Sequence, residues 1–364
     1  MKKIVIFSRD PGGTYAVLPL VDILSEKYCT SVYAKDTAVD IYQRENIPIV
    51  PVRVIGEYTQ IEEIIRKEQP DLVITGTSAD DFCEKYLWKS CQEMNIPTFA
   101  VLDHWCNYGI RFSRYTSAEY AEYKLHNSHD YMPDKILTMD EYSKCKLMEE
   151  KIPEDRIEIV GQPHFEWLVR KAQAYANKGV EAEPKDIIRV LYVSEPYEMI
   201  YGGRARAVSA LGYSEKTVFE ELLKSVERVA LFCTKPIELV IKLHPKESRG
   251  AYDKYLEQKS TAIRYEQRNN IWEFASEMDI ICGMTSMFLL EAYVLGRSII
   301  SIQIGGNDTQ RFILEELGEM KCVRTAQELD EKIRKYILES PTVNGDFFVG
   351  NACKRILKLV EEYI

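Results

Sequence analysis

The chain has 364 residues, of which 46% are hydrophobic, and its formal net charge is −10 at pH 7. This length exceeds what one compact core usually holds, so the sequence predicts two domains. A net negative chain repels phosphate backbones, which argues against nucleic-acid binding.

The nine cysteines are scattered, odd in number and without a CxxC pair. This usage is typical of reduced cysteines in a cytoplasmic protein, and it predicts no metal site. No segment approaches the roughly 20 apolar residues of a membrane span. We therefore expect a cytoplasmic protein without a membrane span, and peripheral membrane contact stays open.

In the first half, short apolar runs alternate with segments of helical periodicity. The predicted strands are 3–8, 31–34, 47–52, 72–75, 97–102, 135–138 and 156–160. The predicted helices are 15–28, 38–45, 61–67, 82–94 and 141–150. Such an alternation of strands and helices favours a parallel sheet covered by helices on both faces. The Tyr-rich segment 108–131 has no clear period and is predicted as a loop or irregular helical excursion.

The first half ends in a predicted connecting helix over 164–177 and a charged linker over 178–186. The second half shows the same alternation of strands and helices. Its predicted strands are 188–193, 237–243, 262–265, 279–282 and 298–302. Its predicted helices are 215–233, 250–258, 270–277, 286–294, 327–339 and 351–363. We expect an α/β fold with two Rossmann-like domains, 1–177 and 178–345, whose parallel sheets face each other across a cleft. The amphipathic helix in 346–364 is expected to pack back on the first domain.

Polar residues at the carboxyl ends of such strands are the natural candidates for a ligand site. Gly12, Gly13 and Thr14 follow the first strand, where small residues let the backbone approach a ligand and a helix start offers N–H groups. The pattern lacks the full GxGxxG fingerprint. A simple tight turn is the alternative interpretation.

Asp103 and His104 follow the apolar strand that ends at Leu102. A carboxylate there can accept a proton, and an imidazole beside it can share or tune that role. A strand cap held by local hydrogen bonds is the alternative. Asp10 is the reserve candidate for the base.

In the second half, Lys242, His244 and Pro245 end a buried strand. Proline fixes the backbone, so the imidazole can be aimed at a ligand and can donate a hydrogen bond to a phosphate oxygen. Lys242 would add positive charge if it faces the same side.

A further strand ends at Gly283, and Thr285 and Ser286 open the next helix. Hydroxyls and backbone N–H groups converge on an anion at such a helix start, although ordinary N-capping is the alternative. Glu291, more than a turn later, could reach ribose hydroxyls. Glu195 is a further candidate, with a solvent-facing turn as the alternative.

The segment Lys242 to Pro245, followed by Thr285-Ser286 and Glu291-Ala292, resembles bacterial sialyltransferases and related capsule-polysaccharide transferases of glycosyltransferase-B (GT-B) fold. It also resembles polyol-phosphate transferases of teichoic acid synthesis. The resemblance implies that His244, Thr285 and Ser286 hold the phosphate of a cytidine-linked donor. It places the catalytic base at Asp103, although His104 and Trp105 stand where an acidic residue and a glycine are expected.

These observations together predict a glycosyltransferase that moves a sugar from a CMP- or UDP-linked donor to a hydroxyl of a saccharide or glycolipid acceptor. We expect an inverting, metal-independent reaction without a cofactor, serving surface polysaccharide or glycoconjugate synthesis. Residues 1–177 would bind the acceptor and residues 178–345 the donor.

Two alternatives remain open. A UDP-N-acetylglucosamine 2-epimerase-like enzyme or a nucleotide-sugar hydrolase would use acid and base groups around the sugar ring and would need no acceptor. A non-catalytic nucleotide-sugar binding subunit is the other alternative.

Overall fold

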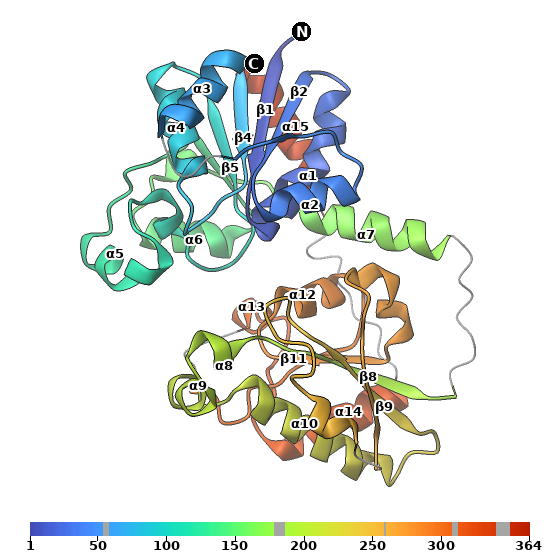
Figure 1. The fold of residues 1–364 in the computed structure, drawn as a ribbon. Helices are drawn as coiled ribbons and strands as arrows, with labels where there is room; N and C mark the ends of the chain where they lie inside the picture. The colour runs from blue at the N-terminus through green and yellow to red at the C-terminus, as the bar shows by residue number, and fades with distance from the viewer. Residues whose placement is uncertain (54–57, 178–185, 258–259, 308–311, 340–349) are drawn as a thin grey trace. The chain divides into compact units, whose positions relative to one another are not determined.

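A computed structural model describes residues 1–53, 58–177, 186–257, 260–307, 312–339 and 350–364 of the chain. It divides into two compact units, drawn in Figure 1. Unit 1 is Met1–Trp167 together with Phe348–Ile364, and unit 2 is Leu168–Phe347. Each unit holds one parallel sheet, so the predicted α/β fold with two Rossmann-like domains is confirmed. The linker predicted over 178–186 lies outside the described residues except for Asp186, and the predicted domain boundaries stay predictions.

Unit 1 contains a seven-stranded sheet in the order β3-β2-β1-β4-β5-β6-β7. Its strands are β1 (Lys3–Ser8), β2 (Cys29–Ala34), β3 (Val50–Pro51), β4 (Leu72–Thr75), β5 (Thr98–Val101), β6 (Lys135–Thr138) and β7 (Ile157–Ile159). All neighbouring pairs are parallel, with Ile4 opposite both Thr30 and Leu72. The strand order reverses between β1 and β4, and ligands of such sheets bind beyond the carboxyl ends at this switch.

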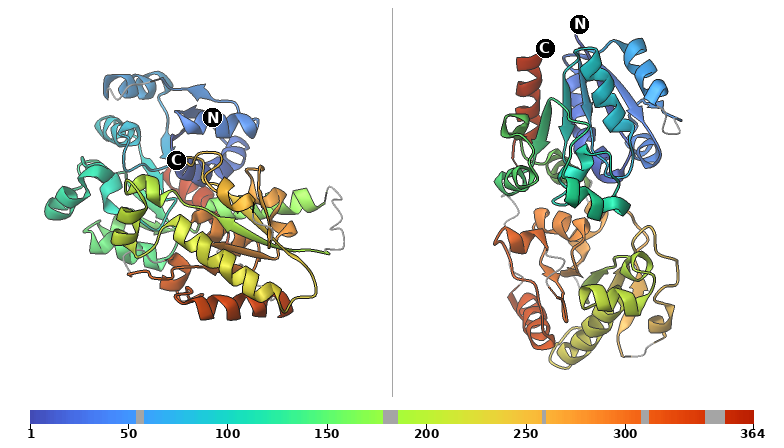
Figure 2. Two further views of the ribbon diagram at one scale, coloured as in Figure 1. Left: turned by 60° about the horizontal axis from the view of Figure 1, so that its bottom comes forward. Right: turned by 90° about the vertical axis from the view of Figure 1, so that its left-hand side faces the viewer.

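Helices cover both faces of this sheet. The helices are α1 (Pro11–Ser25), α2 (Thr37–Arg44), α3 (Tyr58–Glu68), α4 (Cys83–Glu93), α5 (Tyr120–His126), α6 (Glu141–Glu149) and α15 (Ala352–Tyr363). The right-hand view of Figure 2 shows α3, in light blue, and α15, in red, on opposite sides of the sheet. Helix α7 (Pro163–Ala176) carries the chain from unit 1 to unit 2.

The C-terminal helix α15 belongs to unit 1 although it comes last in the sequence. Its buried face includes Ile356 and Val360, both fully inaccessible to solvent. The Tyr363 ring meets the Phe99 ring of β5 edge-on, with centroids 5.0 Å apart. Arg355 also donates from Nη1 to the carbonyl oxygen of Val160 at 3.3 Å. The helix therefore completes the core of the first unit.

Unit 2 contains a five-stranded parallel sheet in the order β10-β9-β8-β11-β12. The strands are β8 (Ile188–Val193), β9 (Ile237–Lys242), β10 (Ala262–Tyr265), β11 (Ile280–Gly283) and β12 (Ile299–Ser301). The helices are α8 (Tyr197–Ile200), α9 (Arg204–Leu211), α10 (Glu215–Ala230), α11 (Asp253–Leu256), α12 (Met287–Val294), α13 (Ile313–Glu316) and α14 (Ala326–Glu339). Here the strand order reverses between β8 and β11, which places the ends of β8, β9 and β11 at the switch.

The structure differs from the sequence prediction in several places. Helix α1 begins at Pro11, four residues before the predicted start, because proline is well tolerated in the first turn of a helix. The helices α8, α9 and α13 were not predicted. The helix predicted over 250–258 is the single turn α11, and the one predicted over 270–277 is two 3₁₀ turns, Ile271–Glu273 and Ala275–Glu277.

The irregular segment predicted over 108–131 contains the 3₁₀ turns Gly109–Phe112 and Ser117–Glu119 and the helix α5. Lys85 of α4 is fully buried beneath it and donates to the carbonyl oxygen of Tyr115 at 3.2 Å. Within the described part of the chain, no helix combines the length and the apolar character that crossing a bilayer demands.

Candidate functional site

Asp103, just beyond the end of β5, forms a buried ion pair with Arg111. The Arg111 Nη1 atom donates to Asp103 Oδ1 at 2.6 Å and to Thr77 Oγ1 at 2.7 Å. Burial opposes the charge of Arg111, but the Asp103 carboxylate more than compensates and raises the pKa of the guanidinium. The pair therefore fixes the position of one oxygen of Asp103.

The other oxygen of Asp103 lies against the first turn of α1. A Cβ atom added to Gly12 would come within 1.9 Å of Asp103 Oδ2, so only glycine leaves room for this carboxylate. Gly13 packs against the backbone just after β4, because a Cβ added to Gly13 would meet the Thr77 backbone nitrogen at 3.1 Å and the Gly76 Cα at 3.2 Å. Both glycines are thus needed for packing within unit 1, and their contact with a ligand stays a prediction. Thr14 is buried and donates from Oγ1 to the Asp10 carbonyl oxygen at 2.7 Å.

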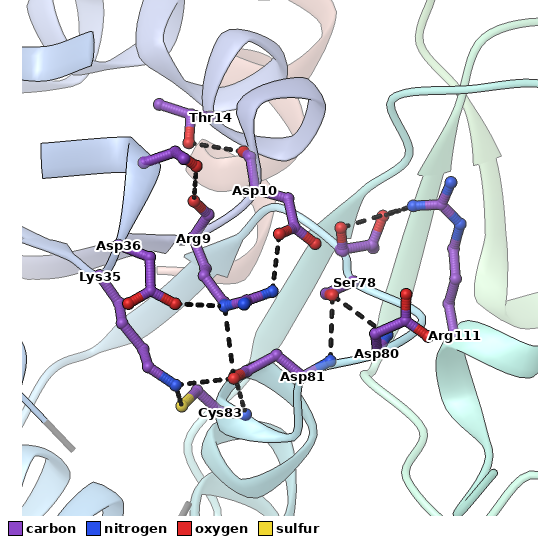
Figure 3. A network of polar contacts seen from close by, with 12 residues as sticks. Arg9, Asp10, Thr14, Lys35, Asp36, Ser78, Asp80, Asp81, Cys83 and Arg111 are labelled. Carbon is purple, nitrogen blue, oxygen red and sulfur yellow. Dashed lines mark hydrogen bonds and ion pairs between the residues drawn. The ribbon is translucent and has the colours of Figure 1, made fainter. Parts of the chain in front are cut away.

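Asp10, the reserve base, belongs to a cluster of charges centred on Arg9 (Figure 3). The Arg9 guanidinium contacts Asp10 Oδ1 and Asp36 Oδ2 at 2.7 Å each and Asp81 Oδ2 at 3.4 Å. Lys35 Nζ adds a second contact to Asp81 Oδ2 at 2.7 Å. Two cations thus face three carboxylates, which leaves one net negative charge.

Sequence reasoning missed the partners in this cluster. The sequence did indicate that these charges would meet. Arg9 directly follows β1 and Lys35-Asp36 directly follows β2, and the carboxyl ends of these two strands are neighbours. The Asp103–Arg111 pair carried no such signal, because Arg111 lies in the irregular segment after β5.

His104 follows Asp103 and is partly exposed. Its Nδ1 atom is buried and has no hydrogen-bond partner among the described residues. Burial lowers the pKa of His104, but the nearby Cys106 and Asp103 outweigh it and raise that pKa. The side chain of Gln162 supports the same strand end, since its Nε2 donates to the Asp103 carbonyl oxygen at 3.1 Å.

In unit 2, His244 lies in the turn after β9 and is held in one tautomer. Its Nδ1 accepts a hydrogen bond from the backbone N–H of Lys246 at 3.1 Å, so the proton of the neutral ring sits on Nε2. Burial and the charge of Lys246 lower the pKa of His244. The ring therefore offers an Nε2–H donor at neutral pH. Glu247 fixes the turn by accepting from the His244 N–H at 2.9 Å.

Lys242 does not join His244. Its Nζ donates to the Arg268 carbonyl oxygen at 2.7 Å, and burial lowers the pKa of the ammonium. Pro245 is exposed in the turn that follows His244.

Thr285 and Glu195 lie in direct contact at the ends of β11 and β8. The Thr285 N–H donates to Glu195 Oε2 at 2.8 Å, and the Thr285 hydroxyl donates to Oε1 at 3.0 Å. Tyr197, which sequence reasoning missed, donates from its hydroxyl to the same Oε1 at 2.9 Å. Glu195 is only 9% exposed, so the alternative of a solvent-facing turn is wrong for this residue.

The remaining candidates surround this contact. Ser286 is the N-cap of α12 and accepts from the Phe288 N–H at 3.2 Å, which is the ordinary capping role. Gly283 ends β11 beside Val193 of β8. Glu291 lies one turn into α12 and is partly exposed. Within the described ranges, no group of three or more His, Cys, Asp or Glu side chains gathers as a metal site would require, and none of the nine cysteines is in a disulfide.

Comparison with known proteins gives matches at the level of structure. No protein-family model matches the chain, and a comparison with curated proteins finds no match. The chain superimposes on UDP-GlcNAc 2-epimerase from Neisseria meningitidis bound to UDP-GlcNAc with a TM-score of 0.72 at 14% identity, covering 99% of this chain and 100% of the other. The corresponding enzyme from Methanocaldococcus jannaschii gives 0.70 at 15% identity, with 99% of each chain covered. MurG from Acinetobacter baumannii gives 0.58 at 11% identity over the full length of both chains.

These matches show that the fold is of the GT-B kind, as the sequence resemblance implied. They contradict the prediction of a glycosyltransferase acting on a hydroxyl acceptor, because several of the matching structures are UDP-GlcNAc 2-epimerases. They favour the epimerase alternative instead. The physical reason for the error is that one fold serves several reactions.

Proposed function

We propose that this chain is a nucleotide-sugar enzyme of the UDP-GlcNAc 2-epimerase kind, which acts on the sugar of its substrate and needs no acceptor. The observation that carries the proposal is the full-length likeness to a UDP-GlcNAc 2-epimerase bound to UDP-GlcNAc, with 99% of this chain covered. The geometry of the two strand-end clusters is consistent with this chemistry.

Unit 2 is assigned the nucleotide. The Nε2–H of His244 is a donor for a phosphate oxygen, and its tautomer is fixed by the Lys246 N–H. Thr285 and Ser286 lie at the start of α12, where the helix dipole favours negative charge. Glu291 is assigned to the ribose hydroxyls. Neither a metal nor a cofactor is part of the proposal.

Unit 1 is assigned the chemistry on the sugar. Inverting a ring carbon that carries hydrogen requires a base to remove the proton and an acid to return one on the opposite face. Asp103 is the proposed base, because it lies just beyond the end of β5 and the hydrogen bond from Arg111 fixes its position. His104 is the candidate for the acid, and Asp10 remains the reserve candidate for the base.

The test is incubation of the protein with UDP-GlcNAc alone in deuterated water, followed by proton NMR. We expect the epimer to appear without any acceptor, with solvent deuterium at the inverted carbon. Free UDP and free sugar as the initial products would indicate the hydrolase alternative instead. Binding of UDP without any conversion would indicate a non-catalytic binding protein.

A further inference from the structure

The turn between β11 and α12, which the proposed function assigns to the phosphates, is already occupied by a carboxylate of the protein itself. Glu195 Oε2 accepts the Thr285 N–H at 2.8 Å, and Glu195 Oε1 accepts the Thr285 hydroxyl at 3.0 Å. The donors expected to hold an anionic ligand are therefore engaged with an internal anion.

A phosphate and an ionised carboxylate cannot share these donors at low cost. Two like charges a few ångströms apart in a poorly solvated site do not both stay ionised, and one of them takes up a proton. Glu195 is the group disposed to do so, because it is only 9% exposed. Burial raises the pKa of Glu195, although the hydrogen bonds from Thr285 and Tyr197 oppose that rise.

The surroundings of Glu195 provide no counter-charge. The groups that face it are Tyr192 from β8, Tyr197 from α8, Thr285 and the backbone of Met284 from the β11–α12 turn, and Tyr213 before α10. Burial raises the pKa of all three tyrosines, so they carry no charge. Among the residues that the structure describes, neither lysine nor arginine forms an ion pair with Glu195.

We infer that Glu195 takes up one proton from solvent when the anionic end of a nucleotide occupies this turn, so that its carboxyl group changes from acceptor to donor toward the ligand. The inference rests on the proposed function, because it concerns the same site. Glu195 then determines specificity: the turn accepts a phosphate only in the protonated form and rejects it as the carboxyl group ionises.

The test is calorimetric titration of the full chain with UDP in Tris and in HEPES, whose ionisation heats differ. We expect the two buffers to reveal uptake of about one proton per UDP bound. Affinity should fall as the pH rises from about pH 7 to about pH 8.5, a range above the second ionisation of the terminal phosphate near pH 6, with a slope of at most about tenfold per pH unit. The reason is that protonation of Glu195 becomes less favourable as the pH rises.

Three variants identify the side chain that takes up the proton when UDP binds. Glu195→Gln should bind UDP without proton uptake, with little pH dependence and more tightly than the unmodified protein at the high end of the range. Glu215→Gln is the matched control, because Glu215 is also buried, with its pKa raised to about 7, but accepts from the Glu198 N–H rather than from Thr285. It should keep the proton uptake. His244→Gln should also keep it, which excludes the imidazole as the proton acceptor.

The possible results distinguish failure of the inference about Glu195 from failure of the proposed function. Proton uptake that persists in Glu195→Gln, or UDP binding by the unmodified protein without any uptake, would overturn the role of Glu195 and leave the proposed function standing. Failure of both the unmodified protein and Glu195→Gln to bind UDP at any pH would overturn the proposed function and the inference with it.

Discussion

The Asp103 carboxylate is held by Arg111 on one side and touched by the first turn of α1 on the other. Asp103→Asn removes the charge while keeping the shape, so turnover of UDP-GlcNAc should fall about 100-fold or more, the usual share of a general base. The affinity for UDP should stay unchanged, because the nucleotide is assigned to unit 2. Steady-state kinetics and calorimetry measure the two effects. Asp36→Asn, which alters another carboxylate at this edge, is the control, and equal turnover in both variants would place the base elsewhere.

His244 is a donor whose orientation is fixed by the Lys246 N–H. Replacing it with alanine should weaken UDP binding by about 1–3 kcal/mol, the cost of a lost hydrogen bond to a charged group. His244→Gln, which retains an N–H donor at a similar distance from the backbone, should recover part of the loss. Unchanged affinity in the alanine variant, measured by calorimetry, would contradict the assignment.

The buried carboxyl group of Glu84 makes the free energy of unfolding of unit 1 depend on pH. Its side chain is 1% exposed, its Oε2 atom has no hydrogen-bond partner in the described part of the chain, and burial raises its pKa to about 8 from a usual value of 4.5. The folded protein thus keeps a proton that the unfolded chain releases. The free energy of unfolding should therefore fall as pH rises from 4.5 to about 8.

Urea unfolding at several pH values measures this dependence. Glu84→Gln should flatten it and stabilise the protein at the alkaline end. Glu149→Gln, whose side chain is 61% exposed, should leave the slope as it is. An unchanged slope in Glu84→Gln would show that this carboxyl group does not titrate abnormally.

At the scale of elements, the start of α1 is the tightest contact near the candidate base. Gly12→Ala places a methyl group 1.9 Å from Asp103 Oδ2, so either the carboxylate or the helix must move. We expect a loss of about 1–3 kcal/mol in unfolding free energy, typical of overpacking, together with reduced turnover. Gly350→Ala is the control, because no atom lies within 4 Å of its added Cβ. Full activity of Gly12→Ala would show that the position of Asp103 is unimportant.

Most helices and strands were predictable, because the pattern of apolar residues that indicates each one lies within its own segment. The strands β1 and β4 are built on continuous apolar runs, β8 is interrupted only by Arg189, and all three have the predicted bounds. Helices α8 and α9 were missed because they are short and separated by Gly202-Gly203, which interrupts the helical period. The decisive side-chain contacts were also missed, since Glu195 and Thr285 are 90 positions apart and only the sheet order brings them together.

At the scale of the whole molecule, the sequence indicated the fold but not the reaction. The histidine-proline turn and the hydroxyl pair at a helix start are proposed to hold an anion, a role that transfer and epimerisation would share. The two reactions would differ in the groups placed around the sugar, and the sequence positions of Asp103, His104 and Asp10 do not reveal such a spatial arrangement.

Helix α15 stabilises a core made mostly of residues more than 180 positions earlier. Ile356→Ala should lower the unfolding free energy of unit 1 by about 2–5 kcal/mol, because it opens a cavity at a fully buried site. Lys358→Ala changes an exposed position of the same helix and should have little effect. Urea unfolding of unit 1 is monitored by the fluorescence of Trp88, Trp105 and Trp167. Trp272 of unit 2 is replaced by phenylalanine so that it does not contribute. Equal stabilities of the two variants would contradict the structural role of α15.

The return of the chain to unit 1 has a consequence for biosynthesis. Domains fold as they emerge from the ribosome, usually in N-to-C order. Here the first unit to be translated is completed by a helix that is made only after the whole of unit 2. Unit 2 can therefore fold before unit 1 is complete, which reverses the usual order.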